Sequence, residues 1–331
     1  MEDKVSIIIP CRNEKQYIGQ CMSSLLSNDY PSKEIIVVDG LSDDGTRDIL
    51  NDFVHKYNNV KLISNPKKIT PVALNLGLNE ASGNYIMIAG AHASFPVNYI
   101  SKMVKKLDEL ENAAGIGGAI KTDGGNTYVA HSIVRVMTDK MGVGNSMFRI
   151  GTEAPIKVDT LPYGLYKKEV FERIGKYDER LVRNQDIELS KRILRNGSNL
   201  YLIPKIKCYY FFKGNYRHLA RSNFNNGLWN ILTFYITKKL SSLSLRHFIP
   251  FLFVLAILIP SVLSIFLQAS LIYISLSVLL TYLVVIVVKS IFLLNRNTRF
   301  IYLIWSFLVL HFAYGLGSLV GLFHFKKLLK H

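Results

Sequence analysis

Short, continuous apolar runs alternate with amphipathic segments along the first 110 residues of the chain. The apolar runs are rich in β-branched residues, which is typical of strands buried on both faces of a parallel sheet. They lie at 5–10, 34–39, 60–64 and 85–89, and segments with helical apolar spacing follow at 17–26, 44–57, 71–81 and 95–110. Strands that alternate with helices predict an α/β fold built on a parallel sheet.

Three long apolar runs occupy the last quarter of the chain. They lie at 248–268, 270–288 and 300–323, and none of them contains Asp, Glu, Lys or Arg. A hydrocarbon core about 30 Å thick needs about 20 helical residues, so each run is long enough to cross a bilayer. The alternative is a helical hairpin buried in a soluble protein, but three such runs in succession are hard to bury in that way. We therefore predict a membrane domain over 248–331, with about three apolar helices.

The formal net charge of +16 is distributed unevenly, and the distribution favours lipid as the partner. Residues 1–188 hold 23 Lys and Arg against 24 Asp and Glu, whereas residues 189–331 hold 17 Lys and Arg and no acid. The positive excess therefore precedes and flanks the apolar runs, as in segments that contact anionic lipid. No basic groove with interleaved aromatic residues precedes it, so nucleic acid is not a predicted partner. Residues 216–240, which are aromatic and basic, are predicted as an interfacial helix.

The start of the chain and the cysteine content favour a cytoplasmic location for the first part. Glu2, Asp3 and Lys4 lead directly into the first strand, without the pattern of a signal peptide. The three cysteines are too few and too scattered for a disulfide framework and fit a reduced compartment. We predict a cytoplasmic domain over 1–240 and a multi-pass location in the cell membrane. The sequence does not indicate an oligomeric state.

Polar residues follow the predicted strands where a ligand site is expected. Ligands of open α/β sheets bind at the carboxyl ends of the strands, which directs attention to residues 10–14, 39–46 and 90–93. Asp39 ends the second strand, and its carboxylate there is suited to accept hydrogen bonds from a nucleotide base or a ribose hydroxyl. The alternative is a turn-forming Asp before Gly40.

These loops resemble those of glycosyltransferase family 2, the inverting nucleotide-sugar enzymes with a GT-A fold. The first reads Pro-Cys-Arg-Asn-Glu at 10–14 and the second Asp-Gly-Leu-Ser-Asp-Asp-Gly-Thr at 39–46. Further matches are Asn-Pro-Lys-Lys at 65–68, Leu-Asn-Leu-Gly at 74–77, Ala-His-Ala at 91–93, Asn-Gln-Asp at 184–186, and the region 223–229. Together they resemble the branch of succinoglycan-type exopolysaccharide glycosyltransferases, over roughly residues 4–235.

The resemblance implies a Rossmann-like nucleotide-sugar-binding domain followed by transmembrane helices. It also implies a set of residues that bind the nucleotide-sugar, with a UDP-sugar as the expected donor. These residues are Pro10, Arg12, Asn13, Glu14, Asp39, Gly40, Ser42, Asp44, Lys68, Asn75 and Ala91. For Arg12 and Lys68 a solvated surface charge is the alternative to a diphosphate contact, and Asp43 or Asp44 is also well placed to cap the following helix.

The metal loop departs from the family. Such enzymes carry an acidic DxD-type loop after the fourth strand, whose carboxylates hold Mg²⁺ or Mn²⁺ against the diphosphate. Here the loop reads Ala-Gly-Ala-His-Ala at 89–93, so Gly90 replaces the Asp of the branch and His92 remains as the one candidate metal ligand. His92 is also suited to donate to a phosphate oxygen. Mg²⁺ or Mn²⁺ is the cofactor that the resemblance implies, and the Gly90 replacement argues against it.

Asp186 is the predicted catalytic base, at the start of a helix expected over 187–196. In the family, an acid at this position deprotonates the acceptor hydroxyl, whereas the alternative is a helix N-cap. Gln185 replaces the Glu that commonly precedes it, and Glu188 is an alternative base or an orienting residue. Trp229 lies where processive relatives carry a Gln-x-x-Arg-Trp motif, although a Trp at the membrane interface is equally expected. Gln185, Glu188 and Trp229 are the predicted acceptor- and sugar-binding residues.

The predicted activity is an inverting, hexosyltransferase-type transfer. One sugar would pass from a nucleotide-sugar to a polyprenyl-linked glycan in exopolysaccharide, capsule or lipopolysaccharide synthesis. A polyprenyl-phosphate sugar synthase is the alternative enzyme. A catalytically degenerate scaffold of polysaccharide assembly is the non-enzymatic alternative, because Gly90 has replaced a motif residue.

Overall fold

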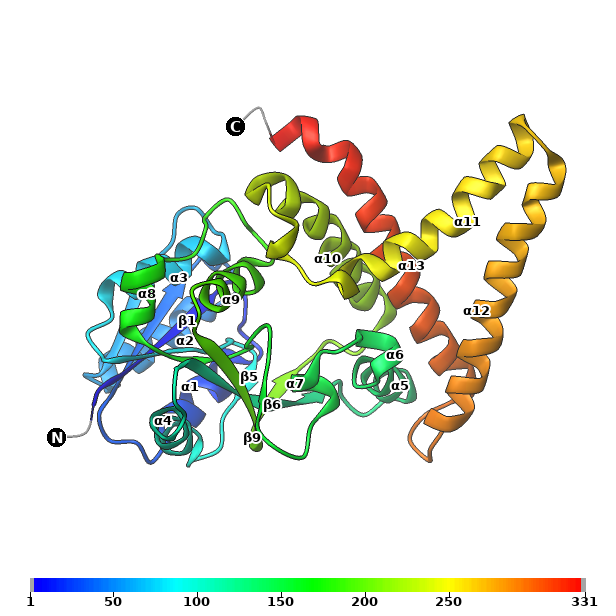
Figure 1. Cartoon of the computed structure of the whole chain (residues 1–331). Coiled ribbons are helices and arrows are strands. Elements are labelled where there is room, and N and C mark those ends of the chain that lie inside the picture. Colours follow the sequence, from blue (N-terminus) through cyan, green and yellow to red (C-terminus); the bar gives the residue numbers. More distant parts are fainter. Residues whose placement is uncertain (1–2, 329–331) are drawn as a thin grey trace. The chain divides into compact units, whose positions relative to one another are not determined.

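The computed structural model describes residues 3–328, which divide into two compact units (Figure 1). The first unit contains the chain up to Asp123 together with residues 147–212. The second contains residues 124–146 and the chain from Lys213 onward. Residues 1–2 and 329–331, which the predicted domains include, lie outside the described residues. The assignment of a cytoplasmic and a membrane domain to these parts stays a prediction.

The first four strands form the predicted parallel half of a sheet. They are β1 (Val5–Cys11), β2 (Lys33–Asp39), β3 (Val60–Ser64) and β4 (Tyr85–Ile88), in the order β3-β2-β1-β4. The helices that connect and follow them are α1 (Ile18–Leu26), α2 (Thr46–Lys56), α3 (Thr70–Glu80) and α4 (Tyr99–Glu109). Two of these helices begin at least two residues later than the sequence pattern indicates. Helix α2 begins after Gly45, whose φ is +92°, and α4 begins after a turn in which Tyr99 N donates to Pro96 O.

The other half of the sheet is mixed, which the strand–helix alternation did not predict. It contains β5 (Ala93–Ser94), β6 (Ala113–Asp123), β7 (Ile156–Lys157), β8 (Leu165–Lys167) and β9 (Asn199–Phe211). Strand β8 pairs antiparallel with both β4 and β6, whereas β6 and β9 are parallel. Within residues 3–328 the strands thus make one nine-stranded sheet. Short helices α7 (Met147–Ile150), α8 (Lys168–Ile174) and α9 (Gln185–Arg195) complete the first unit.

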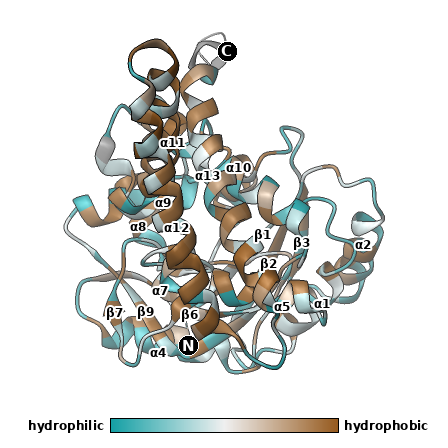
Figure 2. Ribbon diagram, turned by 90° about the vertical axis from the view of Figure 1, so that its right-hand side faces the viewer, coloured by the Kyte–Doolittle hydropathy of each residue, from teal (hydrophilic) through white to brown (hydrophobic). Residues whose placement is uncertain are grey.

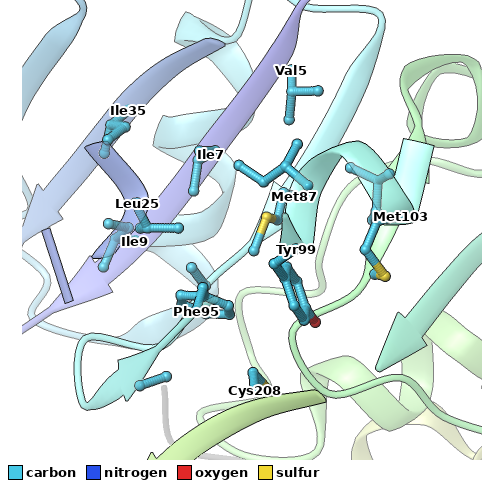
Figure 3. Packing of buried hydrophobic residues seen from close by; sticks show 14 of the residues in the cluster. Val5, Ile7, Ile9, Leu25, Ile35, Met87, Phe95, Tyr99, Met103 and Cys208 are labelled. Atoms are coloured by element: carbon cyan, nitrogen blue, oxygen red, sulfur yellow. The ribbon is translucent and has the colours of Figure 1, made fainter. Parts of the chain in front are cut away.

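Apolar side chains cover both faces of this sheet, as the continuous apolar runs predict. Because successive side chains of a strand point to opposite faces, Ile7 and Ile9 belong to one cluster and Ile8 to the other. The first cluster includes Leu25 of α1 and Tyr99 of α4, which pack against the strands in Figure 3. The polar ends of the strands are therefore held on a rigid, fully packed base.

The second unit is helical. It consists of α5 (Tyr128–Met137), α6 (Lys140–Val143), α10 (Tyr216–Thr237), α11 (Ile249–Phe266), α12 (Ile272–Leu293) and α13 (Phe300–Leu328), with short 3₁₀ turns η1 (Leu240–Ser242), η2 (Leu245–Phe248) and η3 (Ala269–Leu271). Of the described residues, three helical stretches are long and apolar enough to cross a membrane: Leu245–Phe266, Ala269–Leu293 and Phe300–His324. Figure 2 shows α11 and α12 as almost continuously hydrophobic. The predicted apolar helices are confirmed, and α10 lies in the range predicted for an interfacial helix.

Candidate active site

Hydrogen bonds join the loop after β1 (residues 10–15) to the loop after β2 (residues 39–46) at the carboxyl ends of these strands. The two joined loops are called the wall below. Asp39, which ends β2, is fully buried and accepts hydrogen bonds from the backbone N–H and the hydroxyl of Ser42. The Arg47 guanidinium pairs with it, at 3.0 Å between Nη1 and Oδ2. The Ser42 hydroxyl oxygen in turn accepts from Asn13 N at 2.9 Å. The two loops thus share one hydrogen-bonded network that begins at the buried carboxylate.

Three more side chains, those of Asn13, Asp43 and Asp44, form hydrogen bonds within the wall. Asn13 and Asp43 exchange hydrogen bonds, since Asn13 Nδ2 donates to Asp43 Oδ1 at 2.9 Å and Asp43 N donates to Asn13 Oδ1 at 3.1 Å. Asp44 accepts from Lys15 N at 3.1 Å and from Thr46 N at 3.0 Å. Asp44 thus binds the first N–H of α2, but Gly45 occupies the cap position, so the alternative of Asp43 or Asp44 as the cap residue is wrong. Asn13, Ser42 and Asp44, predicted to bind the nucleotide, all hold the loops together.

The remaining predicted nucleotide-binding residues lie in several places, and one of them, Ala91, is buried in the loop between β4 and β5. Pro10, Arg12, Glu14 and Gly40 lie in the same wall, where the Arg12 side chain passes 3.1 Å from the β-carbon position of Gly40. Lys68 is exposed in the loop after β3, and that loop reaches the wall through Asn65 N, which donates to Asp39 O at 2.7 Å.

Asn75 lies elsewhere, on α3. Its side chain donates to Tyr177 O at 2.9 Å and accepts from Tyr177 N at 3.0 Å. It also donates to Glu179 Oε1 at 3.2 Å. Asn75 thus anchors the loop before α9, and through it the segment that carries the predicted base.

His92 follows β4 and meets the wall through Glu14. Its Nδ1 lies 3.0 Å from Glu14 Oε1, and its ring packs edge-on against Tyr210 with 5.1 Å between ring centroids. The Arg149 guanidinium lies 5.5 Å from the Tyr210 ring centre. Burial raises the pKa of the Tyr210 hydroxyl, and the charges of Arg149, Glu14 and Arg183 also act on it. Arg149, which sequence reasoning missed, therefore lies beside the His92 loop.

The loop at 89–93 does not fit the acidic metal site of the family. A β carbon built on Gly90 would lie 2.5 Å from Tyr163 Cε1 and 2.6 Å from Tyr163 Oη, so the tyrosine occupies the space an acidic side chain needs. His92 Nδ1 is engaged by Glu14. Across residues 3–328, no three His, Cys, Asp or Glu side chains come together as a metal-binding group. The donor set thus disagrees with the Mg²⁺ or Mn²⁺ that the resemblance implies.

Asp186 lies in the first turn of α9, two residues after Asn184, which has a φ of +62° and occupies the cap position. The N-cap alternative for Asp186 is therefore wrong. Its side chain reaches solvent. Desolvation by the surrounding protein raises the pKa of its carboxyl above the ordinary value, and hydrogen bonds from backbone N–H groups act in the opposite direction. Its charge acts on the hydroxyls of Tyr166 and Tyr177, which lie nearby. Among the described residues, no Lys or Arg forms an ion pair with Asp186.

The neighbours of Asp186 on α9 differ in their surroundings. Glu188 is buried, and both its oxygens accept from Arg192 Nε, at 2.8 and 2.9 Å. Arg192 also donates to Ile174 O at 2.8 Å and Lys176 O at 2.7 Å, so this pair fastens α9 to the end of α8. Gln185 Oε1 is buried and has no hydrogen-bond partner within residues 3–328. Trp229 lies on α10, in the second unit.

A parallel half-sheet with joined strand-end loops, continued by a mixed half-sheet that leads to an unpaired carboxylate on α9, is the arrangement of a GT-A-type glycosyltransferase. The sequence profile described as "Glycosyl transferase family 2" matches residues 6–175, about half of the chain. The chain therefore belongs to glycosyl transferase family 2, as its loops predicted.

Two named relatives extend the comparison. A Methanococcus voltae protein is 29% identical over 299 residues, which cover 83% of this chain and 92% of that protein. Its name is dolichyl N-acetyl-alpha-D-glucosaminyl phosphate 3-beta-D-2,3-diacetamido-2,3-dideoxy-beta-D-glucuronosyltransferase. Succinoglycan biosynthesis protein ExoA of Rhizobium meliloti (strain 1021) is 29% identical over 209 residues, which are 62% of this chain and 62% of ExoA. The predicted similarity to the succinoglycan branch is confirmed.

A solved structure shows the same fold. Mannosyltransferase PcManGT from Pyrobaculum calidifontis, in complex with GDP-Man and Mn²⁺, matches with a TM-score of 0.61 at 17% identity. The match covers 97% of this chain and 88% of PcManGT. The predicted class, a GT-A fold followed by apolar helices, is confirmed, and the chain is a glycosyltransferase.

Proposed function

We propose that this glycosyltransferase moves one sugar from a nucleotide-sugar, with a UDP-sugar as the expected donor, to a glycan carried on a polyprenyl lipid. The observation that carries the proposal is Asp186, an unpaired carboxylate that reaches solvent in the first turn of α9 and has a raised pKa. A carboxylate with a raised pKa is a stronger base than an ordinary one, and it needs no rearrangement to meet a substrate hydroxyl.

The proposed step is a single displacement. Asp186 removes the proton of the acceptor hydroxyl as that oxygen attacks the anomeric carbon of the donor sugar. The bond from the anomeric carbon to the diphosphate breaks, and the nucleoside diphosphate leaves with the electron pair. Attack opposite the leaving group inverts the anomeric centre. No residue of this step has to form a covalent bond with the sugar.

The nucleotide half of the donor is proposed to lie against the wall formed after β1 and β2. Ser42 and Arg47 already donate hydrogen bonds to the carboxylate of Asp39 and fix its orientation. A nucleotide group that binds Asp39 must therefore enter this hydrogen-bonded network. Arg149 beside the His92 loop supplies positive charge for a diphosphate. Arginine is suited to this contact because its planar guanidinium binds phosphate oxygens in pairs.

The lipid-linked acceptor is supported by the relatives and by the second unit. The name of the Methanococcus voltae relative specifies a dolichyl sugar phosphate, and the match to it covers 83% of this chain. The apolar helices of the second unit suit an enzyme whose acceptor is held in a bilayer. We further propose that the catalytic unit lies on the cytoplasmic side, because the 17 basic residues of 189–331 have no acidic counterparts to offset them there.

Release of nucleoside diphosphate tests the function. Purified full-length protein is given UDP-, GDP- and dTDP-sugars with a polyprenyl-diphosphate-linked glycan, a polyprenyl phosphate, or no acceptor. Release from one donor that requires the glycan acceptor, and is lost in Asp186→Asn, is the expected result. Release that requires only polyprenyl phosphate would identify a lipid-phosphate sugar synthase instead. No release from protein that still binds nucleotide would contradict catalysis and favour a scaffold.

A further inference from the structure

The three apolar helices are not equivalent in their packing. Helices α11 and α12 form an antiparallel hairpin, in which Ser275 Oγ donates to Ile257 O at 2.6 Å and the rings of Phe253 and Tyr282 lie 4.5 Å apart. Only 6% and 11% of their apolar stretches are buried by the protein, against 39% for α13. The hairpin therefore presents nearly all of its apolar surface outward, whereas α13 is largely a packing partner of other helices.

Charge distinguishes the two ends of the hairpin. Its turn, residues 267–271, reads Leu-Gln-Ala-Ser-Leu and carries no charge. The opposite end is flanked by basic residues on both sides: Lys238, Lys239 and Arg246 before α11, and Lys289, Arg296 and Arg299 around the end of α12. By the positive-inside tendency, the turn crosses to the outer side and the basic end stays in the cytoplasm.

The basic end is fixed to residues 124–146. Lys289 Nζ lies 2.9 Å from Asp139 Oδ2, and the Arg299 guanidinium lies 3.8 Å from the centre of the Tyr128 ring. The segment 124–146 leaves the first unit at Asp123 and returns to it at Met147. Because 124–146 contains only short helices and cannot cross a bilayer twice, the basic end of the hairpin lies on the same side of the bilayer as the first unit.

Helix α13 touches the hairpin near the start of α11 and at the middle of α12, where His311 Nδ1 lies 3.0 Å from Tyr282 Oη, and then leaves it. A β carbon on Gly315 would lie 2.4 Å from Pro250 O, and Phe312 packs on Phe253 with 5.4 Å between ring centroids. Beyond this crossing, α11 continues along α12, whereas α13 diverges from it (Figure 1). Two helices that diverge in this way do not both follow the membrane normal.

Past the crossing, α13 packs backbone to backbone on α10. A β carbon on Gly317 would lie 2.0 Å from Phe224 O, and one on Gly227 would lie 1.9 Å from Tyr314 O. Ser318 Oγ donates to Gly227 O at 3.1 Å. The Gly-x-x-x-Gly spacing at 317–321 therefore serves this contact, since small residues allow close approach of two helices. The depth of α13 relative to the bilayer is tied to that of α10.

Helix α10 is poorly suited to the interior of a bilayer. Arg217 and Arg221 are exposed on it, and four asparagines lie at 223, 225, 226 and 230. Lys238 and Lys239 follow directly after its last turn. Charged and amide side chains are costly inside hydrocarbon, and such helices lie at the headgroup level instead.

We propose that only the α11–α12 hairpin crosses the bilayer, and that α10 and α13 lie together at the cytoplasmic lipid surface. The exposed Trp305, Leu316 and Phe323 of α13 then contact the acyl boundary, while Arg217 and Arg221 of α10 meet anionic headgroups. The last turns of α13, with Lys326 and Lys327 in their sequence, come to the same side as the basic residues that flank the hairpin. This topology does not depend on which sugar the enzyme transfers.

Labelling of single cysteines by a membrane-impermeant maleimide tests the topology. Full-length Gln268→Cys, Arg296→Cys and His324→Cys are expressed in intact bacteria; all three positions are exposed. The unsubstituted chain is the blank, because its Cys11, Cys21 and Cys208 are buried. Gln268→Cys should be labelled in intact cells, and the other two only after the membrane is opened. Labelling of His324→Cys in intact cells would show a third crossing and overturn the proposal, as would protection of Gln268→Cys.

A second measurement avoids substitutions in the chain. The unsubstituted protein is fused at its C-terminus to green fluorescent protein or to alkaline phosphatase, which are active in the cytoplasm and in the periplasm, respectively. Fluorescence without phosphatase activity is expected. Phosphatase activity without fluorescence would place the chain end outside and contradict the two-span topology.

Discussion

A β carbon on Gly90 would lie 2.6 Å from the hydroxyl oxygen of Tyr163, which therefore stands where the family's metal-binding carboxylate belongs. Glycine at position 90 therefore does more than remove a metal ligand, because it also leaves the space that Tyr163 occupies. The phenol that fills the gap comes from the loop before β8, on the neighbouring strand of the sheet. Restoring the family motif at this position requires both residues to change.

We expect Gly90→Asp alone to lower the melting temperature without creating a Mn²⁺ site. Overpacking of a filled site costs roughly 1–3 kcal/mol, and the new carboxylate has no room to meet a metal. Gly90→Asp combined with Tyr163→Ala has that room and should bind Mn²⁺ in the presence of UDP, measured by electron paramagnetic resonance. Tyr163→Ala alone is the matched control. Mn²⁺ binding by the single variant, with no loss of stability, would contradict this account.

Asp186→Asn should reduce sugar transfer by about 10²–10⁴-fold, the usual contribution of a general base. Its affinity for UDP should change less than twofold, because the nucleotide wall lies at the ends of β1 and β2. Turnover is measured by nucleoside diphosphate release and affinity by calorimetry. A variant that retains its normal rate would remove Asp186 from the mechanism.

Glu188→Gln should show the opposite pattern. Its two carboxylate oxygens share the single Nε–H of Arg192 in a charge-assisted hydrogen bond, and loss of that charge costs about 1–3 kcal/mol of stability. We expect a lower melting temperature and a kcat within about threefold of the natural enzyme at a temperature where both are folded. If kcat falls a hundredfold in folded protein, Glu188 and not Asp186 is the base.

The raised pKa of Asp186 predicts how stability changes with pH. The folded state favours the protonated carboxyl, so this group stabilises the fold at pH values below its ordinary pKa of 3.8 and loses that contribution as pH rises through the folded value. At pH 7 the charged form is disfavoured, and Asp186→Asn should therefore melt at a higher temperature than the natural protein. Near pH 3 the difference should vanish. Thermal unfolding of both proteins across this range checks the sign, and a less stable variant at pH 7 would contradict it.

Arg149→Ala should weaken UDP binding by about tenfold, because one guanidinium contact to phosphate is worth roughly 1.5–3 kcal/mol before solvent screening. Arg149→Lys should recover only part of the affinity, since an ammonium does not bind two oxygens in the same plane. Calorimetry with UDP and with uridine separates the diphosphate from the base. An equal loss for both ligands would mean that Arg149 acts through the fold.

Sequence patterns predicted those parts of the fold that depend on residues close together in the chain. The β-branched runs at 5–10 and 34–39 became buried strands, and the loops after them met because parallel strands end at the same edge. The fit of Tyr163 against Gly90 and the position of Arg149 beside Tyr210 had no local signal, because each joins segments more than 60 residues apart. Asp44 shows the limit of reasoning from motifs. The motif predicted a nucleotide-binding residue at this position, whereas in the structure Asp44 accepts hydrogen bonds from Lys15 N and Thr46 N and holds the two loops together.

The segment 124–146 interrupts the catalytic unit yet packs with helices that come last in the chain. On the ribosome, these residues are made long before their partners in α12 and α13. Apolar residues of this segment that are buried in the complete structure, such as Ile133 and Val136, therefore lack these packing partners until the final helices have been synthesised. A protein cut off after residue 240 would lack α12 and α13 and would leave these apolar residues of 124–146 without those partners. The order of synthesis thus leaves the second unit, to which 124–146 belongs, as the part of the molecule that is completed last.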